Sequence, residues 1–177
     1  MKRFLLEGLL NQPLTETAPV TDDQTDYTLG HAFKRAARAQ LGRSLSIRHV
    51  DAGSCNGCEM EIHAMNNPFY DLERFGLHFV ASPRHADVLM VTGPVTRNMA
   101  EALRRTYDAT PEPKWVVAVG DCAHGGGCFA GSYAIAGGVE AVVPVDLHIP
   151  GCPPEPNNLL KGLLTLLEGS RAKSRTG

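Results

Sequence analysis

Between residues 46 and 168, short and almost wholly apolar runs alternate with segments whose apolar residues recur at helical spacing. The runs ADVLMVTG and KWVVAVG are apolar on both faces, which is typical of strands in a parallel sheet covered on both sides. Parallel strands need a crossover connection, and a helix usually supplies it. The alternation therefore predicts an α/β domain with a mostly parallel sheet between two layers of helices.

The expected strands and helices follow one another in a regular order. The strands are predicted at 46–53, 77–82, 86–93 and 114–120, with a further extended segment at 139–151. The helices are predicted at 58–67, 96–109 and 153–169. The last of these begins with prolines, which the first turn of a helix tolerates.

The chain is expected to have three regions. Residues 1–45 are an N-terminal helical extension with a short apolar helix, a linker at 15–28 and a basic amphipathic helix at 31–43. Residues 46–168 form the core, because 177 residues suit one compact domain with appendages. Residues 169–177 are basic and lack an apolar pattern, so we expect a frayed C-terminal tail.

Net charge and hydropathy argue against nucleic acid as a partner and against a transmembrane helix. A net charge of −2 does not favour nucleic acid, whose phosphates require a clear basic excess. There is no run of about 18 apolar residues, so we expect no transmembrane helix in this chain. The start MKRFLLEGLL resembles a signal peptide, but Glu7 and Gly8 interrupt its apolar stretch and no twin-arginine pair follows. We therefore expect a cytoplasmic protein.

The cysteines have the most informative placement. Five are too few for a small disulfide scaffold, and their number is odd. Cys55, Cys122 and Cys152 each come just after a predicted strand, and the carboxyl ends of parallel strands share one edge of the sheet. Cys58 joins them because C-x-x-C puts two sulfurs on one tight turn. We interpret these four thiols as ligands of an iron–sulfur cluster, whose sulfides the nearby glycines allow the backbone to approach.

Three other interpretations of these cysteines stay open at this point. A structural zinc site usually has two close pairs, whereas here one pair is joined by two lone cysteines on separate strands. A thioredoxin-like C-x-x-C would also open a helix after a strand, but it leaves Cys122 and Cys152 unexplained. Isolated cysteines are often buried small hydrophobic residues, and we expect this of Cys128.

Three polar features outside the cysteine set also lead to expectations. We expect Asp87 to form a structural pair with Arg84 or His85. His124 lies beside Cys122 and is a candidate donor to a cluster sulfur. The basic helix at 31–43 has three interpretations, which are contact with an acidic partner, contact with anionic headgroups, and a solvated face.

Four segments of the chain together resemble a known family. They are SCNGCEMEI at 54–62, SPRHADVLMVTGPVT at 82–96, GDCAHGGG at 120–127 and PVDLHIPGCPP at 144–154. This set resembles the small electron-transfer subunit of membrane-bound, energy-converting group 4 [NiFe]-hydrogenases of the formate hydrogenlyase and CO-linked type. The same superfamily includes the B (20 kDa) subunit of respiratory complex I. The resemblance covers about residues 44–168 and leaves residues 1–43 outside.

The resemblance implies a flavodoxin-like three-layer fold and one [4Fe-4S] cluster. Its cluster ligands correspond to Cys55, Cys58, Cys122 and Cys152, whereas Cys128 has no counterpart. Glu61 is similar to an acidic residue that the family has three positions after the second ligand. That carboxylate is a candidate proton relay, and the alternative is compensation of charge at the start of a helix.

The resemblance also implies partners. They are a large subunit that holds a nickel-iron site, a ferredoxin-like electron-donor subunit and membrane-arm subunits, on the cytoplasmic side of the membrane. The nickel site uses two C-x-x-C pairs, and this chain has one such pair, so hydrogen evolution or oxidation belongs to the complex. The alternatives are a quinone-reducing complex I-type subunit, a nickel-free hydrogenase-related complex, and a metal-binding scaffold without turnover. The C-N-G-C segment favours the hydrogenase side, because complex I subunits carry two adjacent cysteines at the first ligand position.

Overall fold

The computed structural model describes residues 23–174, with the side chains of residues 28–169. The short helix expected at the start of the chain and the last residues of the expected tail lie outside this part. No helix within the described residues is long and apolar enough to cross a bilayer.

A five-stranded parallel sheet forms the centre of the domain. Its strands are β1 (Leu45–Asp51), β2 (Leu77–Phe79), β3 (Val88–Thr92), β5 (Trp115–Val119) and β7 (Leu147–Ile149). They lie in the order β2-β1-β3-β5-β7, and every neighbouring pair is parallel. The predicted mostly parallel sheet is confirmed.

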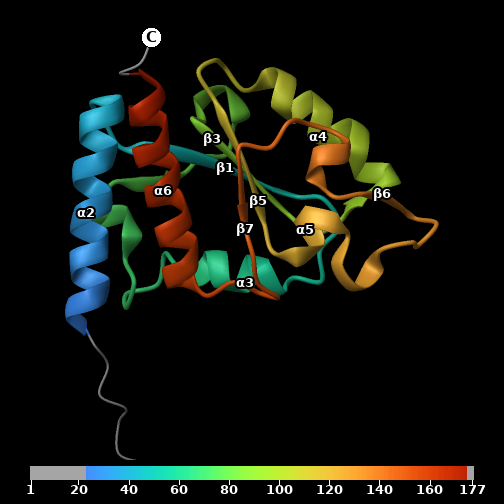
Figure 1. The fold of residues 1–177 in the computed structure, drawn as a ribbon, viewed down its shortest axis with the longest axis horizontal. Helices are drawn as coiled ribbons and strands as arrows, with labels where there is room; N and C mark the ends of the chain where they lie inside the picture. Colours follow the sequence, from blue (N-terminus) through green and yellow to red (C-terminus); the bar gives the residue numbers. More distant parts are fainter. Residues whose placement is uncertain (1–22, 175–177) are drawn as a thin grey trace, which may run out of the picture.

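Helices cover both faces of this sheet. The helices α2 (Asp23–Leu41), α3 (Gly57–Ala64) and α6 (Pro156–Ser174) pack on one face, whereas α4 (Arg97–Ala109) and α5 (Asp121–Gly125) pack on the other. Figure 1 shows α2 beside α6 on one side of the sheet and α4 on the opposite side. Successive side chains of a strand point to opposite faces, so β5 buries Val117 toward α6 and Ala118 toward α4. The flavodoxin-like three-layer architecture is confirmed.

The structure departs from the expected elements in four places. Helix α6 continues to Ser174, through most of the segment expected to be a frayed tail. Helix α2 begins at Asp23, inside the segment expected to be a linker, and its Phe33 and Ala37 are buried in the main core. Only Leu147–Ile149 of the expected extended segment is a strand, because the 3-10 turn η4 (Val139–Ala141) packs into the core before it. A two-stranded antiparallel sheet of β4 (Val95–Thr96) and β6 (Ile135–Gly137) was not expected. Strands of two or three residues are too short to carry an alternating pattern.

Asp87 has a different partner from the one expected. Its carboxylate receives two hydrogen bonds from Arg43, at 2.9 Å from Nη1 and 2.6 Å from Nη2, so the expected pairing with Arg84 or His85 is wrong. The Ser46 backbone N–H also donates to it, at 2.9 Å. The physical reason is the parallel pairing of β1 with β3, which brings the residues before both strands to the same edge of the sheet.

We predict that Asp87→Ala lowers the free energy of unfolding of the full chain by about 1–3 kcal/mol, measured by urea denaturation. The carboxylate is almost fully buried, and its removal leaves the Ser46 N–H without an acceptor. Glu101→Ala is the matched control, because it breaks an exposed ion pair with Arg105 and should cost about 0.5 kcal/mol or less. Equal losses for the two variants would contradict the prediction.

Candidate functional site

The cysteines of the predicted set occupy three loops at the carboxyl edge of the sheet. Cys55 lies in the loop after β1, and Cys58 is in the first turn of α3. Cys122 is the second residue of α5, which begins two residues after β5 ends. Cys152 follows β7 by three residues. All three strands are parallel members of one sheet, so these loops face the same side.

Two glycines lie where these loops approach one another closely. Gly120 has a φ of +86°, and a β-carbon there would lie 2.7 Å from the Cys58 sulfur and 3.2 Å from the Gly151 carbonyl oxygen. A β-carbon on Gly57 would lie 3.6 Å from the Cys55 sulfur and 3.9 Å from Pro153. The backbone just before Cys122 and the backbone around Cys152 therefore both lie against the C-x-x-C turn.

Hydrogen bonds fasten the loop after β5 to the loop after β7. The Gly120 N–H donates to the Ile149 carbonyl oxygen at 2.8 Å, and the Asp121 N–H donates to the Gly151 carbonyl oxygen at 2.9 Å. The Gly151 N–H donates back to Asp121 Oδ1 at 2.9 Å. These three bonds continue the pairing of β5 with β7 into the loops and hold Cys122 and Cys152 in a defined relation.

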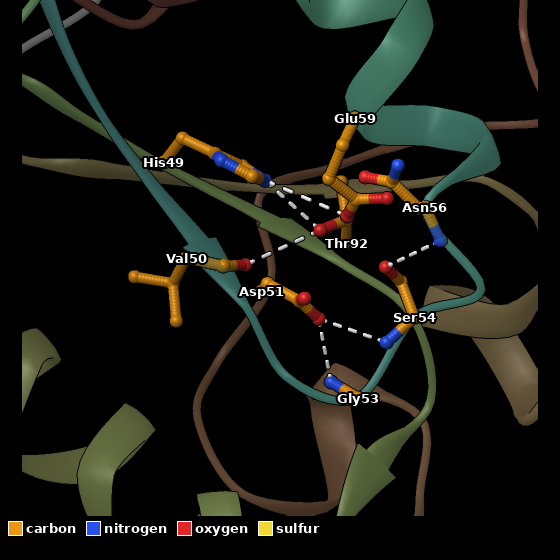
Figure 2. A network of polar contacts seen from close by, with 8 residues as sticks. All are labelled: His49, Val50, Asp51, Gly53, Ser54, Asn56, Glu59 and Thr92. Carbon is orange, nitrogen blue, oxygen red and sulfur yellow. Dashed lines mark hydrogen bonds and ion pairs between the residues drawn. The ribbon is translucent and has the colours of Figure 1, made fainter.

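A separate set of polar contacts folds the turn that carries Cys55. Figure 2 shows Asp51 Oδ1 accepting from the N–H groups of Gly53 and Ser54, both at 2.8 Å, and Ser54 Oγ accepting from the Asn56 N–H at 3.1 Å. Asn56 has a φ of 72° and precedes the first residue of α3. Burial raises the pKa of Asp51, but these hydrogen bonds outweigh it and hold the pKa below its usual value. The turn is thus built around an ionised carboxylate.

Burial and neighbouring charges disfavour ionisation of the Cys58 and Cys122 thiols. Burial, followed by the charge of Glu59 and the charges of Cys122, Cys55 and Cys152, raises the pKa of Cys58 to about 12. Burial and then the charges of Cys128 and Cys152 also raise the pKa of Cys122. Thiolates gathered in this way need a positively charged group to hold them.

The donor set fits an iron–sulfur cluster. Thiolate sulfur is the usual ligand of such clusters, and a side chain at Gly120 would fill the space at the Cys58 sulfur. Likewise, a β-carbon on Gly127 would lie 2.6 Å from the Cys122 sulfur. Among residues 23–174, no three His, Cys, Asp or Glu side chains lie close enough to hold a single metal ion. A cluster takes its ligands at separate corners, so its ligands lie farther apart than those of one ion.

Cys128 does not lie where the sequence predicted. It is exposed rather than buried among hydrophobic side chains. Its backbone N–H donates a hydrogen bond that lowers the pKa of Cys122, although burial and nearby charge raise that pKa overall. Gly126 and Gly127 both have positive φ, which lets the chain turn back over Cys122. This reversal of the chain explains why Cys128 is exposed and not buried.

Sequence reasoning missed the burial of Glu59. The residue is 6% exposed, and neither of its carboxylate oxygens has a hydrogen-bond partner within the described chain. His49 Nε2 lies 3.8 Å from Glu59 Oε1 and 2.9 Å from Thr92 Oγ1, as Figure 2 shows. Burial lowers the pKa of His49, although the Glu59 charge opposes this shift. No local pattern could reveal this cluster, because its residues come from β1, α3 and β3.

Two other predicted residues lie nearby. Glu61 is half-buried in α3, in the helical turn that starts at Cys58, and its role as a proton relay stays a prediction. The His124 ring packs edge-on against the ring of His148, with centroids 4.4 Å apart. Burial, and then the charge of His124, lowers the pKa of His148, which stays mainly neutral near pH 7. Donation from His124 to a cluster sulfur also stays a prediction.

Comparisons with known proteins identify relatives of this chain. A family model described as "NADH ubiquinone oxidoreductase, 20 Kd subunit" matches residues 55–166. The "Probable membrane-bound hydrogenase subunit mbhJ" of Pyrococcus furiosus is 48% identical over 128 residues, which are 72% of this chain and 77% of the relative. "Formate hydrogenlyase subunit 7" of Escherichia coli is 42% identical over 149 residues. That match covers 84% of this chain but 57% of the relative, so the chain spans little more than half of that protein.

A solved structure has the same fold. It is titled "Structure of the membrane-bound sulfane sulfur reductase (MBS), an archaeal respiratory membrane complex", and one of its chains superposes with a TM-score of 0.63 at 32% identity. The match covers 84% of this chain and 75% of the other. The family match begins at Cys55 and includes Cys58, Cys122 and Cys152. The chain therefore belongs to the family of NADH ubiquinone oxidoreductase 20 Kd subunits and is a subunit of the oxidoreductase type.

Proposed function

We propose that this chain holds one [4Fe-4S] cluster and relays electrons within a membrane-bound hydrogenase-type complex. The proposed ligands are Cys55, Cys58, Cys122 and Cys152. The observation that carries the proposal is that Gly120, two residues before Cys122, lies against the Cys58 sulfur, so that a β-carbon on Gly120 would be 2.7 Å from it. When bound, the cluster supplies one-electron transfer at this edge of the sheet.

The residues around the ligands would hold and shield such a cluster. The Cys128 N–H donates toward the Cys122 sulfur, and hydrogen bonds of this kind stabilise negative charge on a cluster ligand. The absence of a side chain at Gly120 and Gly127 leaves the backbone close to the sulfurs of Cys58 and Cys122, respectively. The chain would therefore contribute thiolates, backbone hydrogen-bond donors and close packing. These are features by which a protein sets the reduction potential of a bound cluster.

A partner subunit would cover this edge of the domain. Cys55 and Cys152 are exposed, and a relay has to be brought near the next redox centre. Two large apolar side chains that follow proposed ligands in the sequence are exposed, with Met60 in α3 62% exposed and Phe129 in the 3-10 turn η3 (Gly127–Phe129) 40% exposed. Exposed apolar side chains next to proposed ligands support an interaction surface at this edge. The proposed partner is the large subunit, which would hold the catalytic nickel-iron site.

The names of the relatives support the proposed setting. Relatives are called subunits of membrane-bound hydrogenase and of formate hydrogenlyase, and we infer that this chain is a peripheral subunit of a complex of that kind. The further proposed partners are a ferredoxin-like donor subunit and membrane-arm subunits. In this setting electrons pass between the donor and the nickel-iron site, on the cytoplasmic side of the membrane, as hydrogen is evolved or consumed.

A second candidate function has its own support. The matched solved structure belongs to a sulfane sulfur reductase, and the family description is that of a ubiquinone oxidoreductase subunit. Chains similar to this one thus occur in proteins named for different reactions. The alternative is a quinone-reducing complex I-type complex or a hydrogenase-related complex without nickel. The large subunit would decide between them.

We predict that Cys122→Ser lowers the iron and acid-labile sulfide of the anaerobically purified protein to well under half of the parent content, because one of the four proposed thiolate ligands is lost. Cys128→Ser is the matched control and should keep both, since the backbone N–H that it presents to Cys122 remains. Visible absorption and iron analysis measure the cluster content of both variants. Loss of the cluster from the Cys128 variant would overturn the ligand set, and stoichiometric zinc without sulfide would overturn the cluster itself.

The glycine contacts lead to a separate prediction. Gly120→Ala should also lower the iron content, because its φ of +86° strains any other residue and its β-carbon would press on the Cys58 sulfur. Gly125→Ala changes a glycine five residues later, at the end of α5, where a β-carbon would meet no described atom within 4 Å. It should therefore retain iron and sulfide. Equal retention by both variants would show that Gly120 does not position the site.

Metal analysis of the intact complex tests the proposed reaction. A membrane-bound hydrogenase-type complex should contain nickel in the subunit bound to this chain, together with hydrogen-dependent reduction of a viologen dye. A complex with iron and sulfide but no nickel would favour the second candidate function. This measurement separates the reaction from the electron-relay role, which the cysteine variants test.

A further inference from the structure

A second region of concentrated charge lies at the amino edge of the sheet, away from the cysteines. Here a pocket of about 150 Å³ opens between the end of α2, the 3-10 turn η1 (Leu72–Phe75) and the residues that precede β1. Its polar lining consists of Lys34, Arg38, Arg43, Arg74, Ser44 and Glu73. Four of these six residues are cations from three separate segments.

Two of the cations lack acidic partners. The Lys34 ammonium donates to the carbonyl oxygen of Arg74 at 3.4 Å, and among the described residues neither Lys34 nor Arg38 forms an ion pair. The two side chains are four residues apart on one helix, where like charges destabilise each other. Helix α2 has no acidic residue after Asp26 that would offset them. The proximity of these two cations therefore lowers the stability of the folded chain unless an anion binds beside them.

The acids near this pocket already have partners. Both carboxylate oxygens of Asp87 accept from Arg43, and Asp71 lies 3.6 Å from Arg74. Glu73, which lines the pocket, lies 3.2 Å from the ring of His78. Asp87 and Asp71 hold two guanidinium groups in place, Glu73 contacts a histidine that is charged only when protonated, and none of these carboxylates forms an ion pair with Lys34 or Arg38.

Packing also prepares the pocket for a ligand. The guanidinium of Arg74 lies over the ring of Phe75, 4.7 Å from its centroid. Phe75 is buried, and a β-carbon on Gly30 would lie 2.5 Å from its ring, so the ring is closely packed against α2. Because Phe75 and Asp87 hold Arg74 and Arg43, less side-chain entropy is lost when an anion binds.

The dipole of α2 explains only part of this arrangement. A cation in the last turn, such as Arg38, offsets the partial negative charge of a helix C-terminus. That effect fades within one turn, so it does not account for Lys34, and Arg74 belongs to another segment. Guanidinium and ammonium groups that converge with a serine hydroxyl match the oxygens of a phosphate group.

We propose that this pocket binds a phosphate group. The group belongs either to a soluble phosphate compound or to the headgroup of an anionic lipid. The proposal does not depend on the cluster, since the pocket lies at the opposite edge of the sheet and contains no cysteine. A lipid headgroup would give the basic helix at 31–43 a specific contact with the membrane surface.

In the first experiment the purified complex is titrated with inorganic phosphate, and calorimetry measures the binding. Arg38→Gln should weaken binding about tenfold or more, because it removes a charge-assisted hydrogen bond from the pocket. Arg35→Gln is the matched control, since it removes the same charge from an exposed side chain of the same helix that does not line the pocket. It should change binding less than about twofold. Arg74→Gln repeats the test from η1, and thermal unfolding checks that each variant is folded.

The second experiment uses vesicles of phosphatidylcholine, with and without phosphatidylglycerol. Binding to phosphatidylglycerol vesicles that Arg38→Gln weakens and Arg35→Gln preserves assigns the pocket to a lipid headgroup. The same pattern with inorganic phosphate but not with vesicles assigns it to a soluble compound. The proposal is overturned if both variants weaken binding equally, which would indicate diffuse surface charge. It is also overturned if the parent protein binds neither probe.

Discussion

The parallel register of β1, β3, β5 and β7 is the constraint on which the site depends. Val50, Val91, Ala118 and His148 lie abreast across these four strands, so the loops that follow them emerge together at one edge. The buried faces hold this register, because a shift by one residue would turn every side chain of a strand to the opposite face. The hydrogen bond from Gly120 to β7 then carries the register into the loops that bear the thiols.

The two edges of the sheet have opposite chemical character. The carboxyl edge gathers thiols that raise one another's pKa, and the amino edge gathers Lys34, Arg38, Arg43 and Arg74. The raised pKa values keep the thiols protonated until a metal centre binds, and the cations of the other edge favour a bound anion, so each edge indicates a ligand. The ligands proposed for these two edges are a metal cluster and a phosphate group.

Much of the fold and of the thiol placement could be predicted because the signals are local. The segment VLMV at 88–91 is apolar on both faces, and Cys122 follows its own strand by three residues, so chain order alone places that thiol at the carboxyl edge. Cys128 was misplaced because positive φ at two adjacent glycines reverses the chain, and this leaves no apolar pattern. Asp87 was given the wrong partner because its true partner, Arg43, is 44 residues away and only the strand pairing brings the two together.

The sequence by itself determined the layers of this protein and the edge at which its cysteines lie, because both follow from periodicity and chain order along single segments. Only the tertiary structure decided which residues touch across segments. The backbone at Gly120 meets the Cys58 sulfur, Glu59 becomes buried near His49, and cations from α2 and η1 share one pocket. Such contacts depend on how elements distant in the chain pack together, and no local pattern encodes the distance between two side chains on different elements.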